Sequence, residues 1–249
     1  MQLPAVGLQC IVFGKRYSIA TDAVLDHVAA CGYEAVECGV KDPAAFKRML
    51  DERGMVYGGA HASPTRLLDV RPIVESLKTL DAHDVCNSGL MNWHERTRED
   101  FARTIDVLNR AGRQLRDEGI HLHYHNHDFE FDPVEGAGGK RGIDLLLEGL
   151  DADVVDLCVD VGWVAKAGAD PAEFLVEHKD RVGYLHFKDF NDDGWIELGG
   201  GKVDFAGVMA VLPELTGARW VMIEQDTTRI DPLDSVAVSR KYLKDAFGY

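Results

Sequence analysis

The feature of this sequence that most constrains its fold is an alternation of short apolar segments with longer segments of helical periodicity, repeated from one end of the chain to the other. Short apolar runs are typical of buried parallel strands, and apolar positions three or four residues apart are typical of the helices that connect them. Eight such units predict strands at Val6 to Val12, Ala35 to Cys38, Val56 to Ala62, Asp84 to Ser88, Ile120 to His125, Val154 to Asp160, Val182 to Lys188 and Trp220 to Glu224. The expected helices are Asp22 to Ala30, Pro43 to Arg53, Arg71 to Leu80, Arg98 to Glu118, Asp144 to Glu148, Pro171 to Glu177, Phe205 to Leu212 and Ser235 to Ala246.

Eight strand-helix units predict an α/β fold of the closed parallel (β/α)8 type, the TIM barrel. Such a barrel uses about 250 residues as one domain. No linker or low-complexity tract interrupts the chain, so a single domain over residues 1–249 is expected. Gly32, Gly54, Gly119 and Gly149 stand where helices are expected to end. The alternative is an open doubly wound sheet, but the first strand leads into LQCIVFGKRYS rather than a G-x-G-x-x-G fingerprint, which favours the closed barrel.

The charge of the chain disfavours some classes of partner. Its 42 acidic and 27 basic residues give a formal net charge of -15, which repels nucleic acid and anionic membrane faces. No apolar run approaches the length of a membrane span, and MQLPAVGLQC lacks the regions of a signal peptide, so a cytoplasmic location is expected. The cysteines are odd in number and scattered, which favours reduced thiols at Cys10, Cys31, Cys38, Cys86 and Cys158.

Ionisable residues gather at the ends of the later strands, where a barrel presents its functional side chains. The fifth strand reads IHLHYH and continues into NHDFEF, with Glu130 in the following loop. Alternation with a period of two places His121, His123 and His125 on one face of this strand.

Each of the next three strands ends on a residue type that binds metals. Strand six ends LCVDVGW, strand seven reads YLHFKDF and strand eight reads MIEQD, which brings Asp160, His186 and Glu224 to one rim. Carboxylates combined with imidazole form a mixed oxygen and nitrogen site that suits Mn²⁺, Co²⁺, Mg²⁺ or Zn²⁺. We therefore expect one divalent ion, with Mn²⁺ as the first choice.

Several ordered motifs resemble one family over nearly the whole chain. They are YHNHDFEF, CVDVGW followed by GADPAEFL, YLHFKDF, LGGGKVDF and WVMIEQDTTRIDPLDSVAVSRKYL. The chain resembles the xylose-isomerase-like barrels called sugar phosphate isomerases/epimerases, which are related to the inosose dehydratases and the tagatose-type epimerases. The resemblance implies a TIM barrel that acts on a carbohydrate.

The resemblance also implies a divalent metal bound by four residues from strands five to eight, which fall here on Glu130, Asp160, His186 and Glu224. In the epimerase branch the first glutamate lies within strand five. Here that strand carries histidines, so either Glu130 or a histidine supplies the first ligand. The H-N-H segment looks more like the dehydratase and keto-sugar branches, where a strand-five histidine lies beside the substrate. His125 is therefore expected to act as an acid or base, to bind a hydroxyl, or to orient a ligand.

Other residues are candidates for the mouth of the barrel. Lys188 shares a face with His186, so its ammonium is expected either to reach a substrate oxygen or to pair with Asp189 or another rim carboxylate. His61 and Glu37 end strands three and two and are expected to contact substrate. Trp163 is expected to present its ring to the apolar face of a sugar or to pack at the rim.

A glycine run, Gly199 to Gly201, falls between strands seven and eight, where barrels often bind phosphate through backbone N–H groups. Only Lys202 adds positive charge there, and Val203-Asp204 resembles the family's ordinary turn into a helix. A turn is favoured over a phosphate site. An unphosphorylated sugar, keto-sugar or cyclitol is therefore the expected small-molecule partner.

The expected reaction is metal-assisted proton abstraction next to a carbonyl, through an ene-diolate that the metal stabilises. Glu130 and Glu224 could remove the proton on one face and return it on the other, which gives an isomerase or epimerase. Expulsion of a β-hydroxyl or glycosidic oxygen, with His125 or Lys188 as acid, would instead give a dehydratase or lyase acting on an inosose or 3-keto-glycoside. A non-catalytic sugar-binding or accessory subunit is a weaker hypothesis. A DNA-repair endonuclease is weaker still, because it would need a basic groove. The pattern leaves a homo-oligomer open.

Overall fold

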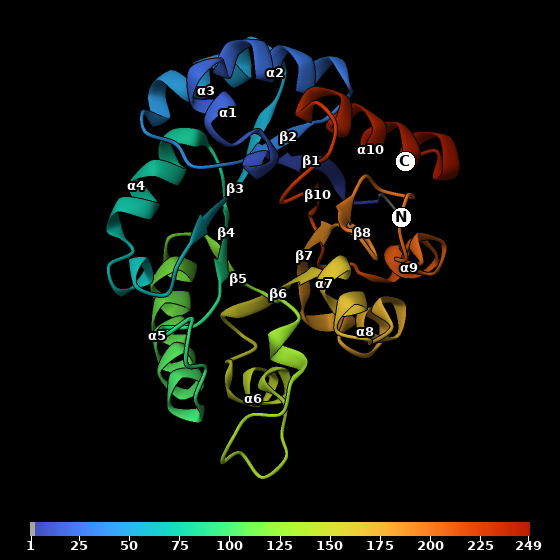
Figure 1. The fold of residues 1–249 in the computed structure, drawn as a ribbon. Helices are drawn as coiled ribbons and strands as arrows, with labels where there is room; N and C mark the ends of the chain where they lie inside the picture. Colours follow the sequence, from blue (N-terminus) through green and yellow to red (C-terminus); the bar gives the residue numbers. More distant parts are fainter. Residues whose placement is uncertain (1–2) are drawn as a thin grey trace.

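The computed structural model describes residues 3–249 and shows a closed barrel of eight parallel strands in the order β1-β10-β7-β6-β5-β4-β3-β2. The barrel strands are β1 (Ala5–Gln9), β2 (Ala35–Glu37), β3 (Val56–Ala62), β4 (Asp84–Ser88), β5 (His121–His125), β6 (Val155–Asp160), β7 (Val182–Phe187) and β10 (Trp220–Ile223). In Figure 1 the view runs along the barrel, with the strands at the centre and helices around them. The closed barrel expected from the alternation is confirmed.

The helices lie outside the strands because each turns one apolar face toward the sheet. They are α1 (Gly14–Ile19), α2 (Thr21–Ala30), α3 (Pro43–Asp51), α4 (Arg71–Leu80), α5 (Arg98–Asp117), α6 (Gly142–Gly149), α7 (Val161–Lys166), α8 (Pro171–Glu177), α9 (Phe205–Val211) and α10 (Pro232–Phe247). Several begin at an aspartate whose side chain accepts a backbone hydrogen bond, including Asp42, Asp170 and Asp231, each followed by proline. An acceptor before a first-turn proline is a strong helix start.

The structure corrects the end of the first strand. The sequence predicts a strand from Val6 to Val12, but β1 ends at Gln9, and Cys10–Phe13 form a 3₁₀ turn. The Gln9 side chain accepts a hydrogen bond from the backbone N–H of Ile11 at 2.6 Å, which starts this turn. The apolar residues continue past the strand because Cys10 and Phe13 are buried in the turn. Burial alone therefore does not separate strand from turn here.

Three elements have no counterpart in the predicted alternation. Helices α1 and α7 follow β1 and β6, and a two-stranded antiparallel hairpin follows β7. The hairpin consists of β8 (Asp189–Asn191) and β9 (Gly194–Ile196). Helix α7 and the hairpin lie above the ends of β6 and β7 and contribute residues to the site described below.

The middle of the barrel is filled by a layer of interior side chains. Buried members of this layer are Ala35, Cys86, Cys158, Tyr184 and Met222. The Met222 side chain fits because Gly7 and Gly58 face it; a Cβ atom at either glycine would lie within about 2.2 Å of Met222 atoms. The polar residues near the carboxyl ends of the strands therefore lie against a closely packed layer and face the carboxyl-terminal opening of the barrel.

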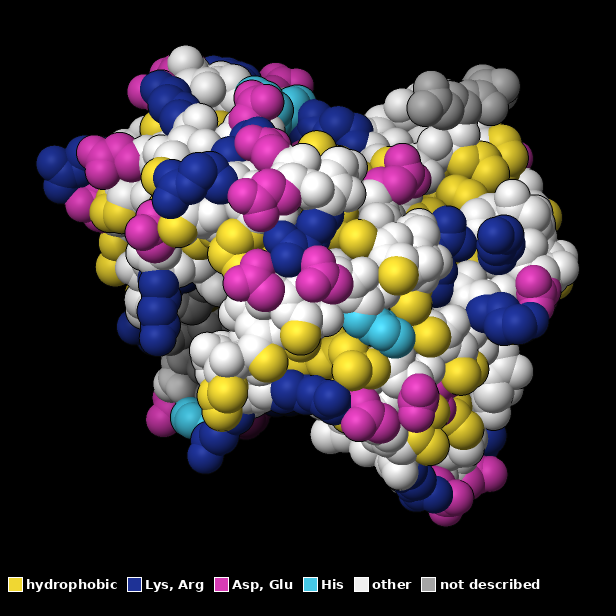
Figure 2. All heavy atoms as spheres, turned by 90° about the horizontal axis from the view of Figure 1, so that it is seen from above, with side chains coloured by type: hydrophobic (Ala, Val, Ile, Leu, Met, Phe, Trp, Pro, Cys, Tyr) yellow, Lys and Arg dark blue, Asp and Glu magenta, His cyan; other side chains and the backbone are white. Residues whose placement is uncertain are grey.

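The outer surface is mixed in character. Figure 2 shows acidic, basic and hydrophobic side chains interspersed over one face of the molecule. Across residues 3–249, no helix combines the length and the apolar character needed to cross a bilayer. All five cysteines are free thiols in the structure.

Candidate metal centre

Four buried side chains from consecutive barrel strands meet at the carboxyl ends of those strands. They are His125 at the end of β5, Asp160 at the end of β6, His186 in β7 and Glu224 directly after β10. One potential ligand atom from each lies within 4.8 Å of the others. The His125 Nε2 atom is 3.5 Å from Asp160 Oδ2 and 3.8 Å from Glu224 Oε2. We call this set the mouth group.

Two atoms of the mouth group are placed so that both could bind the same cation. His125 Nε2 and Asp160 Oδ2 are buried and have no hydrogen-bond partner. Burial, together with electrostatic repulsion from the neighbouring imidazoles, above all that of His186, lowers the pKa of His125 well below its ordinary value. A neutral imidazole offers the lone pair that a metal needs, and buried polar atoms without partners are costly unless something binds them. Two imidazoles and two carboxylates form a set suited to a divalent transition metal.

The local structure of Asp160 leaves one carboxylate oxygen for this role. Asp160 is the N-cap of α7, and its Oδ1 atom accepts the backbone N–H of Trp163 at 3.0 Å. The Asn126 side chain accepts the backbone N–H of Asp160 at 3.0 Å and fixes the end of β6 against β5. The second oxygen, Oδ2, faces the mouth group.

His186 has a carboxylate on each side. Its Nδ1 atom contacts Glu224 Oε2, and its Nε2 atom lies 3.3 Å from Glu37 Oε2. Tyr184 donates its hydroxyl to the same Glu37 oxygen at 2.8 Å. Burial opposes protonation of His186, but the charges of Glu37 and Glu224 outweigh it and raise the pKa of His186 well above its ordinary value. A carboxylate behind the second nitrogen is the usual way in which proteins orient a metal-binding histidine.

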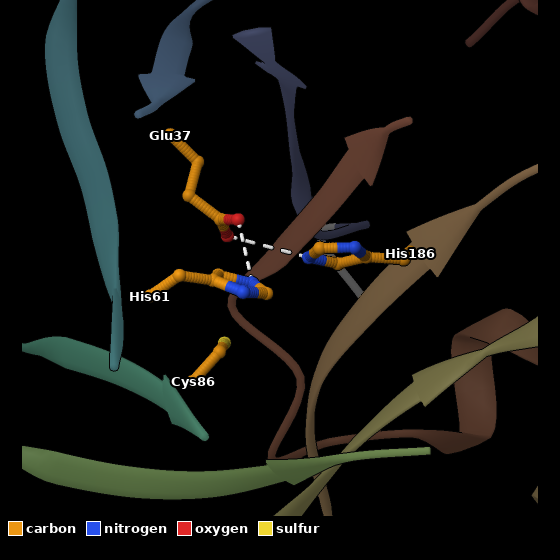
Figure 3. A group of neighbouring side chains, drawn as sticks. All are labelled: Glu37, His61, Cys86 and His186. Atoms are coloured by element: carbon orange, nitrogen blue, oxygen red, sulfur yellow. Dashed lines mark hydrogen bonds and ion pairs between the residues drawn. The ribbon is translucent and has the colours of Figure 1, made fainter. Parts of the chain in front are cut away.

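Glu37 and His61 lie beside His186 (Figure 3), as expected for strands two and three. Glu37 is fully buried, whereas the His61 side chain is 27% exposed and reaches the mouth. Their nearest atoms, Glu37 Oε1 and His61 Nε2, are 2.8 Å apart. Burial alone would lower the pKa of His61, but the Glu37 charge outweighs it and raises this pKa to about 10. His61 therefore carries a proton at neutral pH.

Lys188 forms ion pairs with rim carboxylates rather than with Asp189. Its Nζ atom lies 2.9 Å from Glu224 Oε1, 3.2 Å from both Asp226 carboxylate oxygens and 3.5 Å from Asp160 Oδ2. Burial would lower the pKa of Lys188, but these carboxylates raise it. Asp226 was not expected at the site, although it lies two residues after Glu224 in MIEQD.

Glu130, predicted as a metal ligand and a base, lies outside the mouth group in the structure. Glu130 is buried, but its carboxylate accepts the Tyr124 hydroxyl at 2.8 Å and the backbone N–H of His127 at 2.7 Å. Tyr124 alternates with His125 along β5 and points away from the barrel interior, so it holds Glu130 on the other side of the strand. Glu130 is not a member of the mouth group, and His125 occupies the strand-five position instead.

A second tryptophan, which the sequence did not predict, borders the site beside Trp163. Trp163 lies next to Trp195, which comes from the unpredicted hairpin, with ring centroids 4.5 Å apart. The Lys188 ammonium lies 5.2 Å from the Trp163 ring and 4.7 Å from the Trp195 ring. The two tryptophans therefore border the charged centre and hold Lys188 by cation–π contacts. Lys166 also lies over Trp163, at 4.5 Å, so the ring packs against cations as well as facing the mouth.

The glycine run between β7 and β10 binds a carboxylate of the protein itself. The backbone N–H groups of Gly199 and Gly201 donate to Asp189 Oδ2 at 3.0 and 2.9 Å, and Val203 donates to Oδ1 at 3.1 Å. A Cβ atom at Gly201 would lie 2.2 Å from Asp189 Oδ1, so only glycine allows this close approach. These amides are occupied, which supports a turn rather than a phosphate site.

The family follows from comparison of the sequence with known families. The family described as "Xylose isomerase-like TIM barrel" matches residues 25–246. The chain belongs to this family.

Individual relatives in the family share either sequence or fold with the chain. An inosose dehydratase of Geobacillus kaustophilus is 28% identical over an alignment that covers 92% of this chain and 88% of the relative. A solved sugar phosphate isomerase/epimerase from Parabacteroides distasonis has the same fold, with a TM-score of 0.81, 21% identity and coverage of 99% and 96% of the two chains. The structure of the IOLI protein with a bound zinc atom is also similar, with a TM-score of 0.77, 12% identity and 97% coverage of each chain. Relatives of this chain are thus enzymes that include dehydratases and isomerases.

Proposed function

We propose that this chain is a divalent-metal-dependent enzyme that removes water from an unphosphorylated cyclitol ketone or related keto-sugar. The mouth group, His125, Asp160, His186 and Glu224, would hold the cation. When bound, the cation supplies Lewis-acid polarisation of the substrate carbonyl, which acidifies the neighbouring C–H bond. Mn²⁺ is the proposed ion, with Co²⁺, Mg²⁺ or Zn²⁺ as alternatives, because the donor set combines oxygen and nitrogen.

One observation favours dehydration over two-base epimerisation. The Glu130 carboxylate is bound to Tyr124 and His127 outside the mouth group, so the pair of glutamates expected on opposite faces of a substrate is not assembled. Two protonated groups, His61 and Lys188, border the same centre instead. A carboxylate that accepts a proton, with cationic donors beside it, suits removal of a proton and departure of a hydroxyl group.

The proposed step balances with the residues present. Glu224, the least buried member of the mouth group, accepts the proton from the carbon next to the carbonyl. Lys188 or His61 donates a proton to the hydroxyl on the following carbon, which leaves as water while the carbon–carbon double bond forms. The carbonyl is retained. No oxidant or reductant is required.

The charge of the site supports an unphosphorylated substrate. The Lys188 ammonium is already surrounded by Glu224, Asp226 and Asp160. The Gly199 and Gly201 amides are held by Asp189. The groups best placed to donate hydrogen bonds to a phosphate are therefore already bound to carboxylates of the protein.

The relatives support the same proposal. The inosose dehydratase from Geobacillus kaustophilus aligns over nearly the full length of both chains. Epimerisation or isomerisation is the second candidate, because Asp226 provides another carboxylate at the mouth with a 28% exposed side chain. In that reaction Glu224 would remove the proton from the carbon, and Asp226 would return a proton to the same carbon.

The experiment is incubation of metal-loaded protein in D₂O with inososes, 3-keto-sugars and ketohexoses, followed by mass spectrometry. We expect deuterium at the carbon next to the carbonyl in recovered substrate, loss of one water in the product, and loss of both signals after chelation. A product that keeps all of its oxygen atoms and gains only deuterium would support the epimerase. Turnover that persists after complete removal of divalent metal would contradict the proposal.

A further inference from the structure

A second group of metal-binding side chains lies inside the barrel next to the mouth group. It consists of Glu37 on β2, His61 on β3, Cys86 on β4 and His186 on β7. Figure 3 shows the four side chains turned toward one another from strands around the barrel. One donor atom from each lies within 4.8 Å of the others. We call this set the deep group.

Two donor atoms of the deep group are paired with each other. Glu37 Oε1 and His61 Nε2 form an ion pair at 2.8 Å, and both atoms are buried with no further hydrogen-bond partner. One donor atom from each of the four residues lies within 4.8 Å of the others, which is close enough for all four to share one ligand.

We propose that the deep group is a second divalent-cation site, selective for a borderline-soft ion such as Zn²⁺ or Co²⁺. A thiolate, two imidazole nitrogens and one carboxylate oxygen form a four-coordinate set of the kind that zinc accepts, whereas Mg²⁺ prefers oxygen ligands alone. The thiolate and the carboxylate would balance the charge of a divalent ion. Binding would release the Cys86 thiol proton to solvent, along with protons carried by the two histidines.

The two cation sites would share His186 through different ring atoms. Nδ1 faces Glu224 in the mouth group, and Nε2 faces Glu37 in the deep group. With both ions bound, His186 would bridge them as an imidazolate, with both ring protons released to solvent. The deep site goes beyond the proposed reaction and shares only His186 with the mouth group. With the deep ion bound, His61 would be a ligand, and Lys188 would be the proton donor of the proposed reaction.

An ion also has a route to the deep group. A cavity of about 310 Å³ opens beside β1 and β2 and is lined by Gln9, Tyr17, Glu37, Cys38 and His61 among others. Two of the four proposed ligands thus border open space. Cys86 and His186 are fully buried behind them.

The test is titration of the chelator-treated, full-length protein with Co²⁺ while its absorption spectrum and bound cobalt are measured. A thiolate ligand gives a near-ultraviolet charge-transfer band that oxygen and nitrogen ligands do not give. We expect this band together with two cobalt ions per chain at saturation. Cobalt-loaded wild-type protein without the band would overturn the proposal.

Matched variants locate the sulfur ligand. Cys86→Ser should abolish the band and lower the cobalt content from two ions to one, whereas Cys158→Ser, in the same buried layer, should keep both. Cys86→Ala repeats the test if the serine variant fails to fold. A band that survives in either folded Cys86 variant would show that another cysteine binds the metal and would exclude the deep site.

Further variants separate this proposal from the proposed function. Asp160→Asn combined with Glu224→Gln should remove the mouth ion but leave the thiolate band. If this band is present while wild-type protein shows no metal-dependent exchange with any substrate, the deep site stands and the dehydratase proposal fails. Solvent exchange without the band gives the reverse result.

Discussion

The barrel contains two buried polar networks at opposite ends, and they differ in charge balance. At the amino-terminal end, Asp84 contacts His123 at 2.7 Å and also the Arg219 guanidinium, so one carboxylate lies between two basic groups. At the mouth, Glu37, Asp160, Glu224 and Asp226 surround Lys188, His61 and His186. In the first arrangement the bases outnumber the carboxylate, and the buried atoms without a hydrogen bond, His123 Nδ1 and Arg219 Nε, belong to the bases. In the second the carboxylates outnumber the cations, and Asp160 Oδ2 accepts no hydrogen bond, which suits a cation site.

A structural network and a functional one can be distinguished by their charge balance. Both networks are buried and contain histidine paired with carboxylate, so neither burial nor residue type distinguishes them. What distinguishes the mouth is that its carboxylates outnumber its positively charged partners. Removing the one carboxylate that pairs with both bases should destabilise the fold, whereas removing an acceptor from the mouth should cost function and little stability.

The largest effect is expected at the mouth. Asp160→Asn removes a metal ligand and should lower metal-dependent deuterium exchange at least about 100-fold, since Lewis-acid stabilisation is worth several kcal/mol. Burial is the main factor that raises the pKa of Asp160, so its charge disfavours the metal-free fold. The unfolding free energy of metal-free protein should therefore stay constant or increase. A clear loss of stability in urea unfolding would show that Asp160 is structural.

The same substitution at the other end should have the opposite result. Asp84→Asn leaves Arg219 and His123 without their anion and should lower the unfolding free energy by about 3 kcal/mol, the scale for breaking a buried pair. Bound metal, measured by elemental analysis, should remain unchanged. The comparison breaks if Asp84→Asn empties the metal site or leaves stability unaltered.

The role of Lys188 gives a smaller effect on rate. Lys188→Met keeps most of the side-chain volume but removes the cation beside Glu224. Exchange or turnover should fall about 10- to 100-fold, as expected for loss of a hydrogen bond to a charged group, while metal remains bound. Kinetics and metal content measured on one preparation test this. Full activity in the variant would assign proton donation to His61.

The smallest effect concerns pH. Burial opposes the charge of Asp84, but its hydrogen bond to His123 and the nearby Arg219 outweigh this and lower the pKa of Asp84. A lowered carboxyl pKa gives stability that is present above the unfolded pKa of about 3.9 and is lost as the pH falls through the folded pKa. Asp84→Asn should reduce the acid-side slope of unfolding free energy by at most about 1.4 kcal/mol per pH unit. An unchanged slope below pH 4 would contradict this assignment.

The fold was largely predictable because its signal repeats. The ranges expected for β3 and β4 and for helices α4 and α8 agree with the structure residue for residue, since each combines apolar periodicity with a clear boundary. The end of β1 was missed because the buried turn at Cys10–Phe13 is as apolar as a strand. The β8–β9 hairpin and α7 are short elements that carry no periodic signal.

The site was predictable only in part. Asp160, His186 and Glu224 follow directly from the ends of parallel strands, and the structure brings them together. The position of Glu130 depends on Tyr124, whose hydroxyl donates a hydrogen bond to the Glu130 carboxylate on the other side of β5. Asp226 and Trp195 gain their place through contacts with Lys188 that spacing does not reveal.

We propose that His125, and not Glu130, supplies the strand-five ligand of the mouth group. The most direct test is elemental analysis of His125→Ala and Glu130→Gln after both have been loaded with Mn²⁺ and freed of excess ion. We predict that His125→Ala loses the mouth ion, whereas Glu130→Gln keeps it and shows only a stability loss of about 1 kcal/mol from a weakened bond to Tyr124. Metal retained in His125→Ala but lost in Glu130→Gln would contradict this account.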